Sequence, residues 1–243
     1  MDLTLSLVCI SFAALANVLG GAVVASRQRW DDHVLRYFVA LGAGFMLAAV
    51  LLKMLPEAER LTPLAPVLVL AGYLLIHLFE HTVVSHFHFG EETHPEQLDA
   101  TAGASALLGL LVHSIFDGIS IGSGFIIDRT LGVLLFGAIL LHKAPEGFAI
   151  ASIVRAAGGS RARAILASAI VGAASLLGGL AIFGASSFVG PALAISAGVT
   201  LYVAATDLVP EVNKEGGTAI ALTVFAGVML YYLTERMLAF LGV

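Results

Sequence analysis

The sequence has little charge and almost no cysteine, and both shortages narrow the classes of protein it can belong to. Asp, Glu, Lys and Arg make up only 12% of the 243 residues, and 59% are hydrophobic, whereas a soluble domain carries roughly 25% charged residues. A chain of this length and composition is a multi-pass membrane protein with no room for a large soluble domain. The single cysteine, Cys9, excludes an internal disulfide and a thiolate metal centre.

The first hydrophobic run, residues 3–25, also lacks a basic segment ahead of it. Signal peptides that are removed after targeting carry positive charge before their hydrophobic region. Here one acidic residue, Asp2, precedes the run and no basic residue does. We therefore expect this segment to remain as the first membrane span.

Long apolar runs separated by short polar segments predict an all-α polytopic membrane protein with eight transmembrane helices. Backbone groups in lipid need internal hydrogen-bond partners, which leaves helices or closed barrels, and these runs are too long for barrel strands. We expect residues 1–243 to form one transmembrane domain. The expected spans are residues 3–25, 34–55, 64–84, 103–126, 132–154, 162–188, 192–209 and 218–240.

Basic residues are more numerous in the loops after spans one, three, five and seven, which hold seven Lys and Arg against four on the opposite side. The more basic side is expected to face the cytoplasm, so both termini are predicted to lie outside the cytoplasm. We expect the protein to reside in the cell (inner) membrane. The loop of residues 85–102 has no Lys or Arg. It carries His86, His88, Glu91, Glu92 and His94 instead. We interpret this loop as a cytoplasmic site of weak metal capture, and the alternative is an ordinary solvated loop.

An internal repeat connects the two ends of the chain. Residues 40–58 align without a gap with residues 194–212, with six of nineteen positions identical, including both Pro-Glu pairs. Residues 71–80 align in the same way with residues 226–235. With eight spans the equivalent helices run in opposite directions, which predicts an inverted repeat of spans one to three and six to eight around spans four and five. Inverted repeats around a midplane site are typical of secondary transporters.

Two short motifs in spans four and five carry the chemistry. HSIFD begins at His113 and HKAPE begins at His142, so each histidine lies four residues before a carboxylate, Asp117 or Glu146. Residues i and i+4 lie one above the other on a helix face. Four ionisable groups at mid-bilayer need neutralisation, which a divalent cation supplies. Imidazole with carboxylate suits Zn²⁺, and also Cd²⁺, Fe²⁺ or Mn²⁺.

The motifs HSIFDG and HKAPEG, with YVAATDLVPE in span seven and LGAGFMLAA in span two, resemble the signatures of the ZIP (Zrt/Irt-like) metal transporters. The resemblance covers essentially the whole chain. It implies eight helices with both termini outside, a homodimer, and uptake of zinc or a related divalent ion into the cytoplasm. It also implies a primary metal site on His113, Asp117, His142 and Glu146, with Met46 at a span-two position that reaches this site in some members.

The residue after each histidine departs from the family pattern. Many members hold a second, bridged metal ion with an Asn and an acid at the places occupied here by Ser114 and Lys143. A protonated ammonium cannot ligate a metal, and it puts a positive charge about where the second ion would lie. We therefore predict a single-metal site in which Lys143 holds Asp117 or Glu146 in place of the second cation.

Charged residues near the ends of spans two and seven are candidates for the ion route. Our hypothesis puts Asp207 and Glu211 at the cytoplasmic exit and Lys53 and Glu57 at the outer mouth. The alternative for Asp207 is a helix-end charge with no role in transport.

Two other functions would use the same ligands. An intramembrane metal-dependent hydrolase needs an open coordination position and a base that is not a ligand, and no HExxH motif is present. A metal exporter or proton-driven antiporter would move the ion in the opposite direction. We expect a transporter and not an enzyme, with a divalent metal ion and the lipid bilayer as partners and no nucleic acid.

Overall fold

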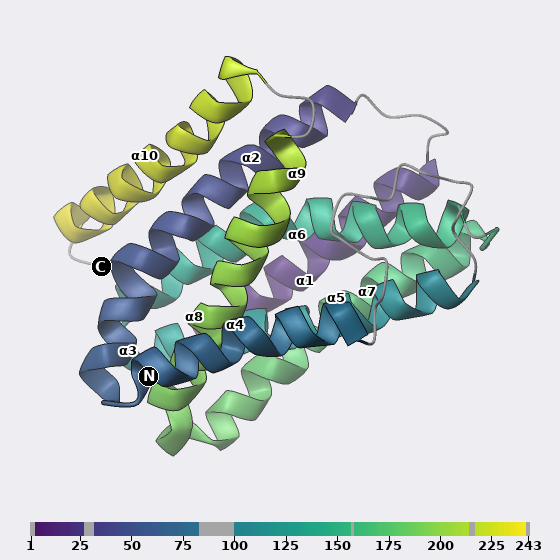
Figure 1. Ribbon diagram of the computed structural model, residues 1–243. Helices are drawn as coiled ribbons and strands as arrows, with labels where there is room; N and C mark the ends of the chain where they lie inside the picture. The colour runs from purple at the N-terminus through teal and green to yellow at the C-terminus, as the bar shows by residue number, and fades with distance from the viewer. Residues whose placement is uncertain (1–2, 27–31, 83–99, 157, 214–216, 242–243) are drawn as a thin grey trace.

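The computed structural model describes residues 3–26, 32–82, 100–156, 158–213 and 217–241, and within these ranges the chain is helical with no strand (Figure 1). The all-α fold class is therefore confirmed. The long helices are α1 (Leu3–Ser26), α2 (Asp32–Ala49), α4 (Ala65–Thr82), α5 (Ala100–Ile127), α6 (Arg129–Ala156), α7 (Arg161–Gly184), α8 (Val189–Tyr202) and α10 (Thr218–Leu241).

Seven segments of the described chain are long and apolar enough to cross a bilayer, and the apolar part of α4, Ala65–Phe79, is shorter. Large apolar side chains such as Phe12, Leu177 and Phe225 point outward and are more than half exposed. Lipid, which needs no hydrogen bonds from the side chains it covers, is the natural solvent for such faces. The chain is thus an integral multi-pass membrane protein with seven to eight membrane-length helices.

Two of the spans contain a π-helical turn. Helix α2 continues through η1 (Val50–Met54) into α3 (Leu55–Leu61), and α8 continues through η4 (Val203–Leu208) into α9 (Val209–Asn213). The sequence alignment, in which residue 40 faces residue 194, puts η1 opposite η4. Because π-helical turns are rare, their occurrence at matching positions supports the predicted repeat.

Helix packing follows the same pairing. Helix α2 packs along α10 as α8 packs along α4, and α1 packs against α6 as α7 packs against α5 (Figure 1). The predicted repeat pairs α1 with α7, α2 with α8, α4 with α10 and α5 with α6. Under this pairing the contact of α2 with α10 corresponds to that of α8 with α4, and the contact of α1 with α6 corresponds to that of α7 with α5. Helices α5 and α6 pack against each other and mainly against α7 and α1, and they also contact α8 and α2.

Close backbone contacts at glycine are paired in the same way. Gly44 of α2 lies against the carbonyl oxygen of Val224, and Gly198 of α8 lies against the carbonyl oxygen of Val69. A Cβ atom on either glycine would overlap that oxygen, so only glycine allows the helices to come this close. Matched contacts of this kind are what an inverted repeat produces, and the repeat remains a prediction that they support.

A single residue, Asp128, joins α5 to α6. Its carboxylate accepts a hydrogen bond from the backbone N–H of Leu131 at 3.0 Å and caps the first turn of α6. Gly124 and Gly132 lie against each other where the two helices meet. Because this connection is so short, it sets the height of α5 against α6 and brings the centres of the two helices level.

Candidate metal centre

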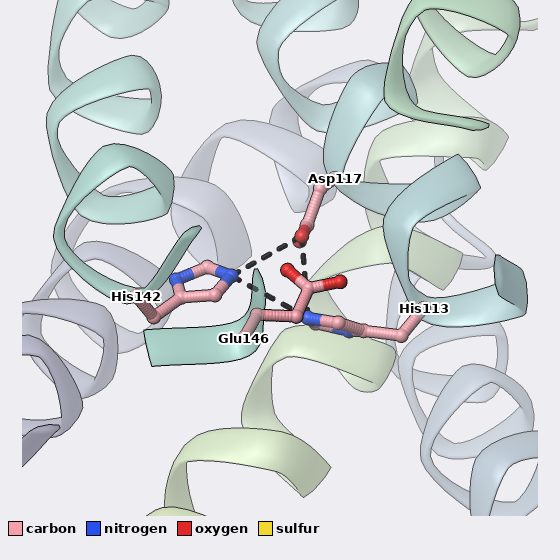
Figure 2. A group of neighbouring side chains, drawn as sticks. All are labelled: His113, Asp117, His142 and Glu146. Atoms are coloured by element: carbon pink, nitrogen blue, oxygen red, sulfur yellow. Dashed lines mark hydrogen bonds and ion pairs between the residues drawn. The ribbon is translucent and has the colours of Figure 1, made fainter. Parts of the chain in front are cut away.

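Four side chains from α5 and α6 converge at the centre of the bundle (Figure 2). His113 and Asp117 belong to α5, and His142 and Glu146 belong to α6; none is more than 5% exposed. One nitrogen or oxygen atom from each of the four lies within 4.8 Å of the others. In the described part of the chain this is the one group of three or more His, Cys, Asp or Glu side chains that can hold a metal ion in this way.

The three closest donor atoms are spaced as a tetrahedral metal site requires. Oδ2 of Asp117 lies 3.2 Å from Nε2 of His113 and 3.1 Å from Nε2 of His142, and the two Nε2 atoms are 3.4 Å apart (Figure 2). Zinc bonds of about 2.0–2.1 Å in tetrahedral geometry separate neighbouring ligand atoms by about 3.3 Å. The donor set and its spacing therefore suit Zn²⁺ or an ion of similar size.

A hydrogen bond decides which nitrogen of His142 faces the site. Its Nδ1 lies 3.2 Å from the carbonyl oxygen of Ala138. Because a carbonyl only accepts hydrogen bonds, Nδ1 donates to Ala138, and Nε2 is the nitrogen that faces Asp117 and His113 and that could bind a metal ion. Metal-ligating histidines commonly bind a carbonyl or carboxylate in this way through their other nitrogen.

Lys143 points into the same group of side chains and is fully buried. Its Nζ lies 2.8 Å from Oδ2 of Asp117, 2.5 Å from Oε2 of Glu146 and 2.6 Å from Oγ of Ser114. The hydroxyl of Ser114 in turn donates to Oε1 of Glu146 at 2.5 Å. The structure thus brings Ser114 and Lys143 to the candidate metal-binding carboxylates, and Lys143 contacts both of them where the sequence suggested one or the other.

The glycine that follows each carboxylate sets the depth of the site. Gly118 lies against the backbone carbonyl of Ser175 on α7, and Gly147 lies against that of Asn17 on α1. A Cβ atom at either position would overlap the carbonyl oxygen. These contacts seat α5 on α7 and α6 on α1, so that both carboxylates face the same point between the two helices.

Comparison with known proteins agrees with these features. A model of the family described as ZIP zinc transporter matches residues 90–235, which is more than half of the chain. The chain belongs to the ZIP zinc transporter family.

Several curated ZIP proteins are similar in sequence. The zinc transporter ZIP9 of Micropogonias undulatus is 32% identical over 65% of this chain and 54% of its own length. The zinc transporter ZIP9-B of Xenopus laevis is 26% identical over 89% of this chain and 88% of its own length. The metal cation symporter ZIP14 of Bos taurus is 21% identical over 86% of this chain and 60% of its own length. The chain therefore spans about half of the first relative and most of the second.

In this ZIP protein the two outer-mouth candidates each have a protein partner. Nζ of Lys53, in the π-helical turn η1, lies 3.9 Å from Oε1 of Glu235 on α10, and both side chains are about one-third exposed. Glu57 accepts hydrogen bonds from the guanidinium of Arg60, one turn further along α3. These contacts do not test whether Lys53 and Glu57 line the ion entrance, so that role stays a prediction.

The remaining candidates lie outside the four-residue group. Asp207 is buried in the π-helical turn η4, and the side chain of Glu211 lies outside the described residues. Met46 is buried in an apolar cluster with Leu134 and Leu135 of α6. The histidines of the polar loop also lie outside the described residues, namely His86, His88 and His94.

Asn17 is a buried polar residue that sequence analysis missed. It is completely buried on α1 beside Gly147, and neither atom of its side-chain amide has a hydrogen-bond partner in the described structure. An asparagine in an apolar span is itself a signal, because polar side chains within membranes are rare and mark functional regions. Its contact with Gly147, the residue after Glu146, puts it directly behind the four-residue group.

Proposed function

We propose that this ZIP protein transports divalent transition-metal ions, with zinc as the main substrate, across the membrane toward the cytoplasm. The observation that carries the proposal is the convergence of two imidazoles and two carboxylates, all buried, within a bundle of membrane-length helices. Ionisable groups at this depth are costly unless they neutralise one another or bind an ion. Membership of a zinc transporter family supports zinc as the cargo, and the same donor types admit Cd²⁺, Fe²⁺ and Mn²⁺.

In this proposal the ion loses water stepwise to His113, Asp117, His142 and Glu146. Nitrogen and oxygen donors replace water molecules at similar distances, so the ion is never without ligands. The ion enters past Lys53 and Glu57 and leaves past Asp207 and Glu211. Met46 is proposed to reach the ion from span two, and the polar loop binds the released ion through His86, His88 and His94.

The centre holds one ion per protomer in our proposal. Lys143 is within 2.8 Å of both carboxylates and occupies the place where a second, bridging cation would need their oxygens. An ammonium has three donors and no lone pair, so it cannot act as a ligand. The protomers form a homodimer, and each contains a complete set of four ligands.

Equilibrium dialysis against zinc tests the stoichiometry. In a variant with the loop histidines 86, 88 and 94 changed to alanine, we expect about one bound ion per protomer at saturation, since four ligands complete a tetrahedral ion. Two ions bound per protomer in that variant, both lost in His142→Ala, would contradict the single-metal centre.

Uptake into proteoliposomes tests the transport function. The purified chain should take up zinc, and His113→Ala or Asp117→Ala should lower the rate at least about tenfold, because removing one ligand typically costs more than 1.4 kcal/mol of ion binding. His77→Ala is the matched control, since His77 is an exposed histidine of α4 outside the four-residue group and should leave the rate unchanged. No uptake of zinc, cadmium, iron or manganese by the wild type would refute the proposal, as would full uptake by His113→Ala.

A further inference from the structure

Lys143 gives the buried site a net charge of the same size with and without a divalent ion. Counting both imidazoles as neutral, Asp117 and Glu146 contribute two negative charges and Lys143 contributes one positive charge, which leaves minus one. A bound divalent ion changes the sum to plus one. Without the ammonium the two sums would be minus two and zero.

This difference matters for a carrier that moves its site between the two sides of the membrane. The idealised energy of a charge in a low-dielectric interior rises with the square of the charge, so a site of minus two costs about four times as much as a site of minus one. A site without the ammonium would move easily when loaded and poorly when empty. Such a carrier exchanges ions and cannot complete net uptake.

The geometry lets the ammonium act on the same atoms as the ion. Nζ of Lys143 lies 2.8 Å from Oδ2 of Asp117, the oxygen that both imidazole Nε2 atoms also approach. Lys143 is next to His142 on α6 and therefore moves with the ligands. The hydroxyl of Ser114, 2.6 Å from Nζ, supplies an acceptor that stays with the ammonium when an ion takes the carboxylate oxygens.

We infer that Lys143 is a tethered counter-cation that allows the site to return across the membrane without an ion, so that the protein carries out net uptake as a uniporter. The inference rests on the proposed transport function and adds that transport is net uptake and not obligatory exchange of ions. It requires no metal or other cation on the opposite side for the return step.

Two flux measurements in the same proteoliposomes test it, with the membrane potential clamped by potassium and valinomycin and with saturating zinc outside. Net uptake is measured into zinc-free vesicles, and exchange is measured as entry of isotopic zinc into vesicles loaded with unlabelled zinc. We expect the wild-type net rate to lie within about threefold of its exchange rate. In Lys143→Met the ratio of net uptake to exchange should fall at least about tenfold, because the empty site then carries minus two.

A second substitution separates charge from packing. In the double variant Lys143→Met with Glu146→Gln, Asp117 is the one charged group left, and the sums return to minus one and plus one. We expect the ratio of net uptake to exchange to recover to within about threefold of wild type, even though the zinc concentration needed for saturation rises. Lys143→Arg, which keeps the charge, should also keep the wild-type ratio.

An unchanged ratio in Lys143→Met, or no recovery in a double variant that still exchanges zinc, would overturn the inference. Wild-type net uptake more than about tenfold slower than exchange would overturn it even if every variant misfolded. That result would leave metal transport itself intact, since exchange would still be present. Absence of both fluxes in the wild type would instead refute the proposed function.

Discussion

The hydroxyl of Ser114 makes hydrogen bonds to both a cation and an anion of the site. It accepts a hydrogen bond from the ammonium of Lys143 and donates one to the carboxylate of Glu146, and all three groups are fully buried. A buried hydrogen bond to a charged group contributes more than one between neutral groups, and losing it leaves the charged partner unsatisfied. At the scale of single residues, Ser114 thus positions both the lysine and a proposed ligand.

Ser114→Ala should therefore destabilise the protein by about 1.5–3 kcal/mol and weaken zinc binding through Glu146. Thermal unfolding in detergent, with and without zinc, measures both effects. Ser120→Ala is the matched control, because Ser120 is buried on the same helix and its hydroxyl has no hydrogen-bond partner in the described structure. Equal loss of stability in the two variants would contradict the positioning role of Ser114.

The helices are positioned mainly by close backbone contacts and by one short connection. Gly118 and Gly147 seat α5 and α6 on α7 and α1, and Asp128 alone joins the two central helices. The π-helical turns η1 and η4 lie in the flanking spans and contain Lys53 and Asp207. At the scale of elements, the proposed ligands are held by tightly seated α-helices, while Lys53 and Asp207, two of the four proposed route residues, lie on turns with irregular hydrogen bonding.

Gly147→Ala is expected to destabilise the protein by about 1–3 kcal/mol and to lower zinc uptake, because the added methyl group pushes α6 away from the carbonyl of Asn17. Thermal unfolding and proteoliposome uptake measure the two effects. Gly184→Ala is the control, since Gly184 is at the end of α7 with no atom within 4 Å of an added Cβ. A Gly147→Ala protein as stable and active as Gly184→Ala would show that the close contact is not needed.

At the scale of the whole molecule, the N-terminal and C-terminal halves of the predicted repeat make equivalent helix contacts. The glycine contacts between α2 and α10 match those between α4 and α8, and the two π-helical turns fall at equivalent residues. An inverted repeat provides inward-facing and outward-facing forms of similar energy, because each half can adopt the conformation of the other. The proposed transport mode needs such a pair of forms.

Orientation in the membrane is a prediction at this scale. In a Cys9→Ala background, Pro63→Cys in the turn between α3 and α4 should react with a membrane-impermeant thiol reagent from outside intact cells. Arg161→Cys, at the start of α7, should react after permeabilisation only. Both positions are exposed, so equal reactivity is expected once the membrane is open. Labelling of Arg161→Cys in intact cells would reverse the predicted topology.

Much of the site could be predicted because its signals are local in the chain. The four-residue spacing of His113 to Asp117 and of His142 to Glu146 determines their stacking on any helix. Apolar length predicted the helices in the same way, although the apolar part of α4 within the described residues, Ala65–Phe79, is shorter than the other spans. The additional contact of Lys143 with Asp117, and the burial of Asn17 behind Gly147, could not be predicted, since they join residues on different helices.

By itself the sequence determined the membrane class, the helices and the two histidine–carboxylate pairs, since hydropathy and helical period depend only on neighbouring residues. The tertiary structure alone decided that the two pairs are level, that three donor atoms lie 3.1–3.4 Å apart, and that Lys143 contacts both acids. These features depend on the rotation and separation of the helices. Packing of glycines against carbonyl groups distant in the chain sets both quantities, and no local pattern encodes them.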